Sequence, residues 1–176
     1  VYALYYRLTF PGNAGPTTYR LTPVQCFQFA GTFGFWQGDK RVVKEVCWYV
    51  PRKYSKTTST AALAVHDLLF GESNGEAYVG ANSFDQATTC FHVIRKCVRR
   101  LDPHGKRSVV NEDQIKSLRA DRDAFAQCLT ANASTKDGLN ASIVIMDEFS
   151  QAADSELLTV LTTSMGVRKN PLTVII

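Results

Sequence analysis

Two short stretches of the sequence hold the residue types that phosphate and metal chemistry needs. The first reads C-W-Y-V-P-R-K-Y-S-K-T-T, an apolar run that breaks into a polar loop carrying Lys56 and Thr57. The second reads S-I-V-I-M-D-E, an apolar run that ends in the adjacent carboxylates Asp147 and Glu148. A loop lysine and hydroxyl can meet phosphates and Mg²⁺, while an aspartate at a strand end holds the metal through its shell and the next glutamate orients a water. The two stretches therefore predict the two halves of a nucleoside-triphosphate site.

The first stretch matches the phosphate-loop pattern G-x-x-x-x-G-K-[ST] only in part. Pro51 and Ser55 stand where the two glycines belong. A Lys-Thr pair after a strand can also be an ordinary solvated loop, and two carboxylates can mark an exposed strand end. Two observations favour a nucleotide site over these alternatives. A doubly charged strand end is costly unless it faces a cleft or a cation. Both halves of the site also occur in the right order, about ninety residues apart.

Composition sets the broad class. The 176 residues, 45% of them hydrophobic, are enough for one domain with its own core, and no stretch approaches the roughly 20 apolar residues of a membrane span. The N-terminus lacks the layout of a signal peptide. The net charge of +4 permits nucleic-acid binding without demanding it. Five cysteines without a C-x-x-C predict buried thiols in a reducing compartment and argue against a zinc site or a disulfide frame.

Strand and helix patterns alternate along the chain. Apolar runs predict strands, and 3.6-residue periodicity predicts helices. The strands are expected at residues 42–50, 76–80, 142–146 and 172–176, with a hairpin over 114–118 and 124–130 and a loop at 11–16. The aromatic-rich residues 2–10 predict either a strand or an arm packed on a larger body. The helices are expected to begin at 21–25, to run over 56–69 and 154–165, and to follow a capping box at 83–86. This alternation predicts βαβ units in a mostly parallel sheet.

The helix after Ser83 is strongly amphipathic. Its apolar face is formed by Ala87, Phe91, Ile94, Val98 and Leu101. A basic strip lies mainly off that face and consists of Arg95, Lys96, Arg99 and Arg100. Such a strip is either a solvated surface or a contact with a DNA backbone or another subunit.

Five motifs in order resemble a known family. They read L-T-P-V-Q, V-P-R-K-x-x-K-T-T, E-A-Y-V-G-A-N-S-F-D-Q-A, D-G-L-N-A-S-I-V-I-M-D-E and G-V-R-K-N-P-L-T-V-I-I, and span residues 21–176. This series is similar to the ATPase domain of the tailed-phage terminase large subunit. The resemblance implies an α/β P-loop NTPase fold of the ASCE/RecA-like kind, with helices flanking a mostly parallel sheet. It also implies an ATP hydrolase that translocates double-stranded DNA into a procapsid.

The resemblance assigns roles to individual residues. Gln25 resembles the glutamine that reads the adenine edge, and Arg52 the arginine that terminases place near the phosphates. Thr57 and Asp147 resemble the Mg²⁺ ligands, and Glu148 resembles the catalytic glutamate, assisted by Arg52. The residues expected to contact ATP are Gln25, Arg52, Ser55, Lys56, Thr57 and Thr58.

The resemblance also implies partners and a location. They are double-stranded DNA, a portal protein, a small terminase subunit and further copies of the chain in a ring, in the host cell cytoplasm and away from membranes. Residues 1–176 are expected to form one domain that stops before the family's coupling motif and nuclease domain, because the sequence ends within an apolar run. Poor ATP turnover is expected without a neighbour's arginine, for which the candidates in this chain are Arg119, Arg122 and Arg168.

Ser55 is the main departure from the family pattern, which has glycine there. A serine in a left-handed conformation costs about 1 kcal/mol or more, which would weaken nucleotide binding. Alternatively its hydroxyl contacts the nucleotide or caps the following helix. Two other functions stay open: a helicase-like P-loop ATPase, and an assembly scaffold that no longer hydrolyses ATP.

Overall fold

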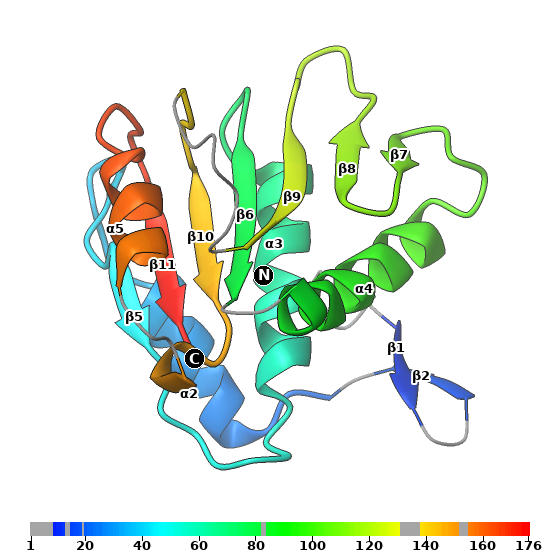
Figure 1. Cartoon of the computed structure of the whole chain (residues 1–176), viewed down its shortest axis with the longest axis horizontal. Helices are drawn as coiled ribbons and strands as arrows, with labels where there is room; N and C mark the ends of the chain where they lie inside the picture. Colours follow the sequence, from blue (N-terminus) through cyan, green and yellow to red (C-terminus); the bar gives the residue numbers. More distant parts are fainter. Residues whose placement is uncertain (1–8, 13–14, 19, 82–83, 131–137, 152–154) are drawn as a thin grey trace.

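A seven-stranded sheet forms the centre of the computed structural model, which describes residues 9–12, 15–18, 20–81, 84–130, 138–151 and 155–176. Its strand order is β5-β11-β10-β6-β9-β8-β7 (Figure 1). The first five strands in this order run parallel, and β8 and β7 are antiparallel additions at one edge. The bounds are β5 (Glu45–Cys47), β6 (Glu76–Ala81), β7 (Ser108–Val110), β8 (Gln114–Ser117), β9 (Phe125–Thr130), β10 (Ile143–Met146) and β11 (Leu172–Ile175). The mostly parallel α/β sheet expected from the sequence is confirmed.

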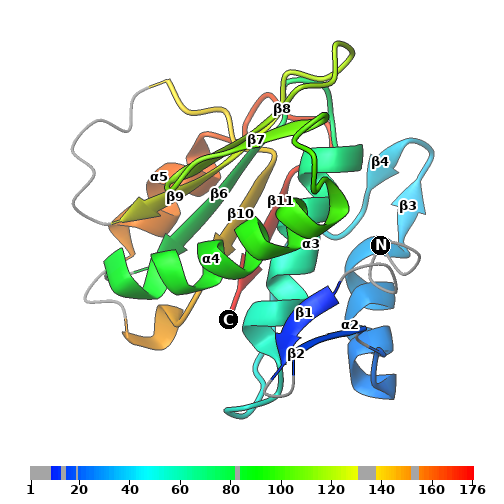
Figure 2. The ribbon, with the colours of Figure 1, turned by 90° about the vertical axis from the view of Figure 1, so that its right-hand side faces the viewer.

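Helices cover both faces of this sheet (Figure 2). One face carries α2 (Pro23–Phe33), α3 (Lys56–Phe70) and α4 (Phe84–Leu101), and the other carries α5 (Glu156–Thr163). Strand β10 shows why its sequence is apolar throughout. Ile143 and Ile145 belong to the core under α3 and α4, while Val144 and Met146 belong to the core under α5. A central strand with both faces covered requires such a continuous apolar run.

Local sequence signals explain the helices on the first face. Thr22 caps α2 and forms a capping box with Gln25, and proline stands at the first helical position. Residues 61–65 of α3 are almost completely buried, because small and branched apolar side chains let the helix lie close to the sheet. The predicted apolar face of α4 is confirmed: its first four members are buried, and Leu101 is partly buried.

Because Gly80 on β6 has no side chain, the side chains of Met146 on β10 and Leu157 on α5 pack closely against its backbone. A Cβ atom at this position would lie 2.6 Å from the Met146 sulfur and 3.2 Å from a Leu157 methyl group. The Gly80 carbonyl accepts a hydrogen bond of 3.0 Å from the Asp147 backbone N–H. This packing and hydrogen bond therefore hold the end of β10 in place, and with it the position of Asp147 and Glu148.

The predicted strand over residues 42–50 is wrong in its extent. The chain first forms the hairpin of β3 (Trp36–Gln37) and β4 (Lys40–Arg41), and only Glu45–Cys47 joins the sheet. Strand β5 lies at the sheet edge and pairs with β11 alone, so a long buried strand is not needed there. Val42 and Tyr49 are exposed, while Trp48 is buried and donates its backbone N–H to the Ile175 carbonyl at 2.8 Å.

Two further predictions need correction. The loop expected at residues 11–16 contributes to the hairpin of β1 (Thr9–Gly12) and β2 (Gly15–Thr18). Helix α5 ends at Thr163, with Ser164 as its C-cap, and does not reach Gly166. Threonine and serine hydroxyls in its last turn donate to backbone carbonyls three or four residues earlier, a contact that competes with helix continuation. The capping serine expected at position 83 and the start of the strand or arm expected at 2–10 lie outside the described residues.

The remaining predicted elements are confirmed. They are α2, α3, β6, α4, the β8–β9 hairpin, β10 and β11. Among the cysteines, Cys90 and Cys97 are buried, but Cys47 is exposed, so the prediction of buried thiols fails at that position. No described helix is long and apolar enough to cross a membrane.

Candidate functional site

The loop between β5 and α3 has an unusual backbone. Lys53 and Ser55 both adopt left-handed conformations, with φ of 66° and 57°. Ser55 occupies the N-cap position of α3, but its side chain makes no capping hydrogen bond. The hypothesis that the serine hydroxyl caps this helix is therefore wrong. The strained angle expected at this position is present, and it turns the loop directly into the first helical turn that begins at Lys56.

The end of β10 faces this loop. In Figure 1 the last residues of β10 and the first turn of α3 lie at the same lower edge of the sheet, which is the carboxyl edge of its parallel strands. The Lys56 ammonium lies 3.7 Å from Oε1 of Glu148. Glu148 itself has a φ of 53°, and the next backbone N–H, of Phe149, donates to the Ile176 carbonyl at 3.1 Å. The two predicted halves of the site thus converge, as the sequence required.

The Lys56–Glu148 ion pair contributes little stability. The two side chains are 25% and 35% exposed, so solvent screens the attraction, and such a pair is worth up to about 1 kcal/mol. The ion pair matters because of its position: it holds the Lys56 ammonium and the Glu148 carboxylate side by side where the loop enters α3.

The surroundings of Asp147 disfavour its charged form. Its side chain is 6% exposed, and its Oδ1 is buried without a hydrogen-bond partner among the described residues. Burial raises the pKa of Asp147, the neighbouring Glu148 raises it further, and Lys56 acts in the opposite direction. A buried acceptor without a partner is suited to a cation shell. Asp147 therefore fits a Mg²⁺ ion, which takes few protein ligands and keeps several waters, while the part of Thr57 in such a site stays a prediction.

The described residues contain no group of three or more histidine, cysteine, aspartate or glutamate side chains arranged to hold a metal ion. A Mg²⁺ site that uses one carboxylate, one hydroxyl and phosphate oxygens needs no such group. The finding therefore leaves Thr57 and Asp147 open as the predicted Mg²⁺ ligands.

Comparison with known proteins identifies the family. The family model of the terminase large subunit ATPase domain matches residues 23–176. The chain belongs to this family. The matched region includes both halves of the site, so the terminase ATPase domain accounts for nearly the whole described fold.

Solved structures share the fold of this terminase domain. The large terminase of bacteriophage HK97 superposes with a TM-score of 0.80 at 22% identity, over 99% of this chain and 36% of that one, so this chain spans little more than a third of that protein. The large terminase ATPase domain of a Thermus phage matches with a TM-score of 0.61 at 18% identity, over 89% of this chain and 70% of that one. The large terminase of a thermophilic bacteriophage in complex with ADP matches with a TM-score of 0.57 at 11% identity, over 78% and 34%. At these identities the structures show a shared fold. A search of curated protein sequences found no match.

Gln25 of the terminase domain lies beside α3 with its side chain almost fully buried. Its Oε1 accepts hydrogen bonds from the backbone N–H and the hydroxyl of Thr22, at 2.9 and 3.1 Å. Its Nε2 donates to the Ser59 hydroxyl at 3.2 Å. The amide therefore ties the start of α2 to α3. Its role in reading adenine stays a prediction, and it requires some of these bonds to be exchanged for bonds to the base.

The other predicted nucleotide contacts occupy the loop and the first turn of α3. Arg52 is exposed, while Ser55, Thr57 and Thr58 are partly buried. Their positions around Lys56 are consistent with phosphate contacts, and their individual roles stay predictions.

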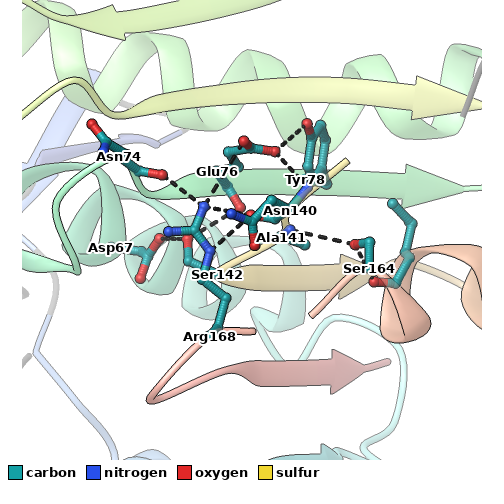
Figure 3. Close-up of polar contacts among 10 residues, drawn as sticks. Asp67, Asn74, Glu76, Tyr78, Asn140, Ala141, Ser142, Ser164 and Arg168 are labelled. Carbon is teal, nitrogen blue, oxygen red and sulfur yellow. Dashed lines mark hydrogen bonds and ion pairs between the residues drawn. The ribbon is translucent and has the colours of Figure 1, made fainter. Parts of the chain in front are cut away.

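The three candidate trans-acting arginines all have partners within their own chain. Arg168 donates to the carbonyls of Asn140 and Asn74 at 2.8 and 2.7 Å and lies 3.9 Å from Glu76, in the cluster that Figure 3 shows. Arg122 donates to the Gly71 carbonyl, and Arg119 pairs with its neighbour Asp121. These contacts lie at the edge of the sheet opposite Lys56, where the parallel strands begin. The arrangement gives Arg168 a structural role in holding that edge together.

One contact at the site was not anticipated. Gln86, in the first turn of α4, donates from Nε2 to Oε2 of Glu148 at 3.4 Å. The sequence assigned Gln86 to a capping box, so its proximity to the second carboxylate was overlooked. The signal that could have revealed it is topological: the segment after β6 leaves the same sheet edge as the segment after β10.

A cavity of about 490 Å³ lies at the opposite edge and is lined in part by Arg41, His66, Asp67 and Asn170. The Arg41 guanidinium stacks on Phe33, 4.6 Å from the ring centre. Burial lowers the pKa of His66 to about 4, with Arg41 and Arg122 acting in the same direction. The cavity is lined by residues from the C-terminal half of α3, whereas Lys56 is the first residue of that helix. The cavity is therefore distinct from the predicted phosphate site.

Proposed function

We propose that this terminase ATPase domain binds ATP with Mg²⁺, hydrolyses it, and uses the energy to drive double-stranded DNA into a viral procapsid. The observation that carries the proposal is the meeting of Lys56 with Asp147 and Glu148 at the carboxyl edge of the parallel sheet. Ligands of open α/β sheets bind outside this edge. A loop lysine and a strand-end carboxylate pair are what phosphoryl transfer to water requires there.

Each group would contribute a separate part of the chemistry. Lys56 and the backbone N–H groups of the α3 start would neutralise the phosphate oxygens, with Arg52 beside them. Thr57 and Asp147 would hold Mg²⁺, which when bound spreads the charge of the β- and γ-phosphates. Glu148 would orient the attacking water and accept its proton. Gln25 would contact the adenine.

Double-stranded DNA as the partner is supported by where the charge lies. Six of the 20 Lys and Arg residues and one of the 16 Asp and Glu residues fall within residues 95–107, so this stretch carries +5 while the rest of the chain carries −1. Arg99, Lys106 and Arg107 are exposed. Asp102 accepts hydrogen bonds from three backbone N–H groups, of residues 106–108, and so folds the connection back against the end of α4. The exposed basic residues at and just after the end of α4 are suited to contact a phosphate backbone.

The assembly partners follow from the proposed motor. We propose further copies of the chain in a ring, a portal protein and a small terminase subunit, acting in the host cell cytoplasm. Family membership supports these partners, and no contact within the chain assigns a surface to any of them.

Titration with a non-hydrolysable ATP analogue and Mg²⁺ tests the nucleotide site. Lys56→Ala should weaken binding by about 10- to 150-fold, because bonds from a charged group are worth about 1.5–3 kcal/mol. Lys53→Ala is the matched control, since Lys53 is an exposed lysine of the same loop and should leave the affinity within about twofold. No binding by the unmodified chain would instead favour the scaffold function.

A further inference from the structure

Glu148 has two carboxylate oxygens with different neighbours. Oε1 lies 3.7 Å from the Lys56 ammonium, and Oε2 accepts a hydrogen bond from the Gln86 amide at 3.4 Å. The lysine side is the side on which the phosphates would lie. The carboxylate is thus oriented, with one oxygen toward the reaction and the other toward α4.

Gln86 lies on a helix that packs into the core. It occupies the first turn of α4, and the next residues on the inner face of that helix, Ala87 and Cys90, are completely buried. Glu148 stands after the end of β10 in a left-handed conformation. A contact from a packed helix is therefore well placed to limit the rotation of this side chain.

We propose that Gln86 is a positioning residue for hydrolysis, which holds Oε2 of Glu148 so that Oε1 faces the attacking water. The proposal rests on the proposed ATPase function. A neutral amide suits this task, because it donates a hydrogen bond to the carboxylate without competing with Lys56 for it or removing its charge. In this proposal Gln86 acts on the reaction through Glu148.

Steady-state ATP turnover and analogue binding test this role in parallel. Gln86→Met keeps the length of the side chain but removes the donor, and should lower kcat about tenfold, a modest loss for a bond to a charged group because the 3.4 Å separation is long. Gln86→Glu places a second carboxylate beside Glu148 and should lower kcat further. In both variants KM for ATP and the affinity for the analogue should stay within about twofold, and the crystal structure of Gln86→Met should show Glu148 in a different or mixed side-chain conformation.

Two controls separate positioning from packing. Gln114→Met removes the donor from another glutamine pair, the 3.5 Å contact with Gln127 on β8 and β9, and should leave kcat unchanged. When combined with Glu148→Gln, the Gln86→Met change should cost no further activity, because the carboxylate that it positions is gone.

The outcomes distinguish the proposal from its premise. An unchanged kcat in Gln86→Met, or an equal loss with and without Glu148, would overturn the positioning role while leaving ATP hydrolysis established. A parallel loss of nucleotide affinity and thermal stability would overturn it in favour of a packing role. Absence of turnover in the unmodified protein at every concentration would refute the ATPase function itself.

Discussion

Ser55→Gly tests the strained phosphate loop. The serine backbone stands at a φ of 57°, a conformation that costs an ordinary residue about 1–2 kcal/mol and glycine almost nothing. The greater freedom of glycine in the unfolded chain costs about 0.5–1 kcal/mol. Since the serine side chain makes no capping bond that would be lost, the free energy of unfolding should rise by about 0.5–1 kcal/mol. For a domain of this size, a gain of about 1 kcal/mol corresponds to a Tm increase of about 2–4 °C.

Nucleotide affinity should tighten in the same variant, by up to about fivefold, because the loop can turn its N–H groups inward with less strain. Lys53→Gly is the matched control: Lys53 has a φ of 66° in the same loop but does not precede Lys56, so it should gain stability without gaining affinity. Calorimetric titration with a non-hydrolysable ATP analogue and denaturant unfolding measure the two quantities. A tenfold loss of affinity in Ser55→Gly would show that the serine hydroxyl contacts the nucleotide, and a loss of stability would refute the strain argument.

Three more predictions concern DNA, pH and assembly. The double variant Arg99→Glu/Arg107→Glu should weaken binding of double-stranded DNA and should lower the slope of log affinity against log salt by about 1 for each lost phosphate contact. Arg119→Glu is the control: because Arg119 pairs with Asp121, its replacement should change this slope little. The pKa of His66 is about 4 in the folded protein and about 6.5 in the unfolded chain, so the unfolded state binds more protons below pH 6.5 and the free energy of unfolding falls as the pH drops toward 4. Between pH 7 and pH 5, the unmodified protein should lose about 2 kcal/mol more of this free energy than His66→Leu does, as measured by denaturant unfolding. ATP turnover per chain should rise with protein concentration if a neighbour supplies an arginine, and a rate that is constant on dilution would place every catalytic group within one chain.

The strongest sequence predictions came from residues whose neighbours along the chain determine their environment. Strand β10 was predictable because only a strand covered on both faces is apolar throughout, and its two terminal carboxylates then had to face a cleft. The amphipathic pattern of α4 likewise identified its buried face. The meeting of Lys56 with Glu148 followed once both strands were assigned to one parallel sheet.

The parts that sequence could not predict depend on tertiary contacts. The run over residues 42–50 is apolar enough for a core strand, but its place at the sheet edge shortens β5 to three residues. No local pattern indicates that Gln86 reaches Glu148 across the sheet edge, or that Glu148 has a positive φ. Arg168 is one surface-type residue among many in the sequence, and only the fold shows that it bonds to carbonyls of two separate segments.

The central claim is that Glu148 activates water at a site that binds nucleotide through other groups. The most direct measurement compares ATP binding and ATP hydrolysis in Glu148→Gln, at a protein concentration where the unmodified chain turns over detectably. The amide cannot accept the proton of the water, so hydrolysis should fall by about 100-fold or more while the affinity for ATP stays within about twofold. An unchanged rate of hydrolysis would remove Glu148 from the mechanism and contradict the account.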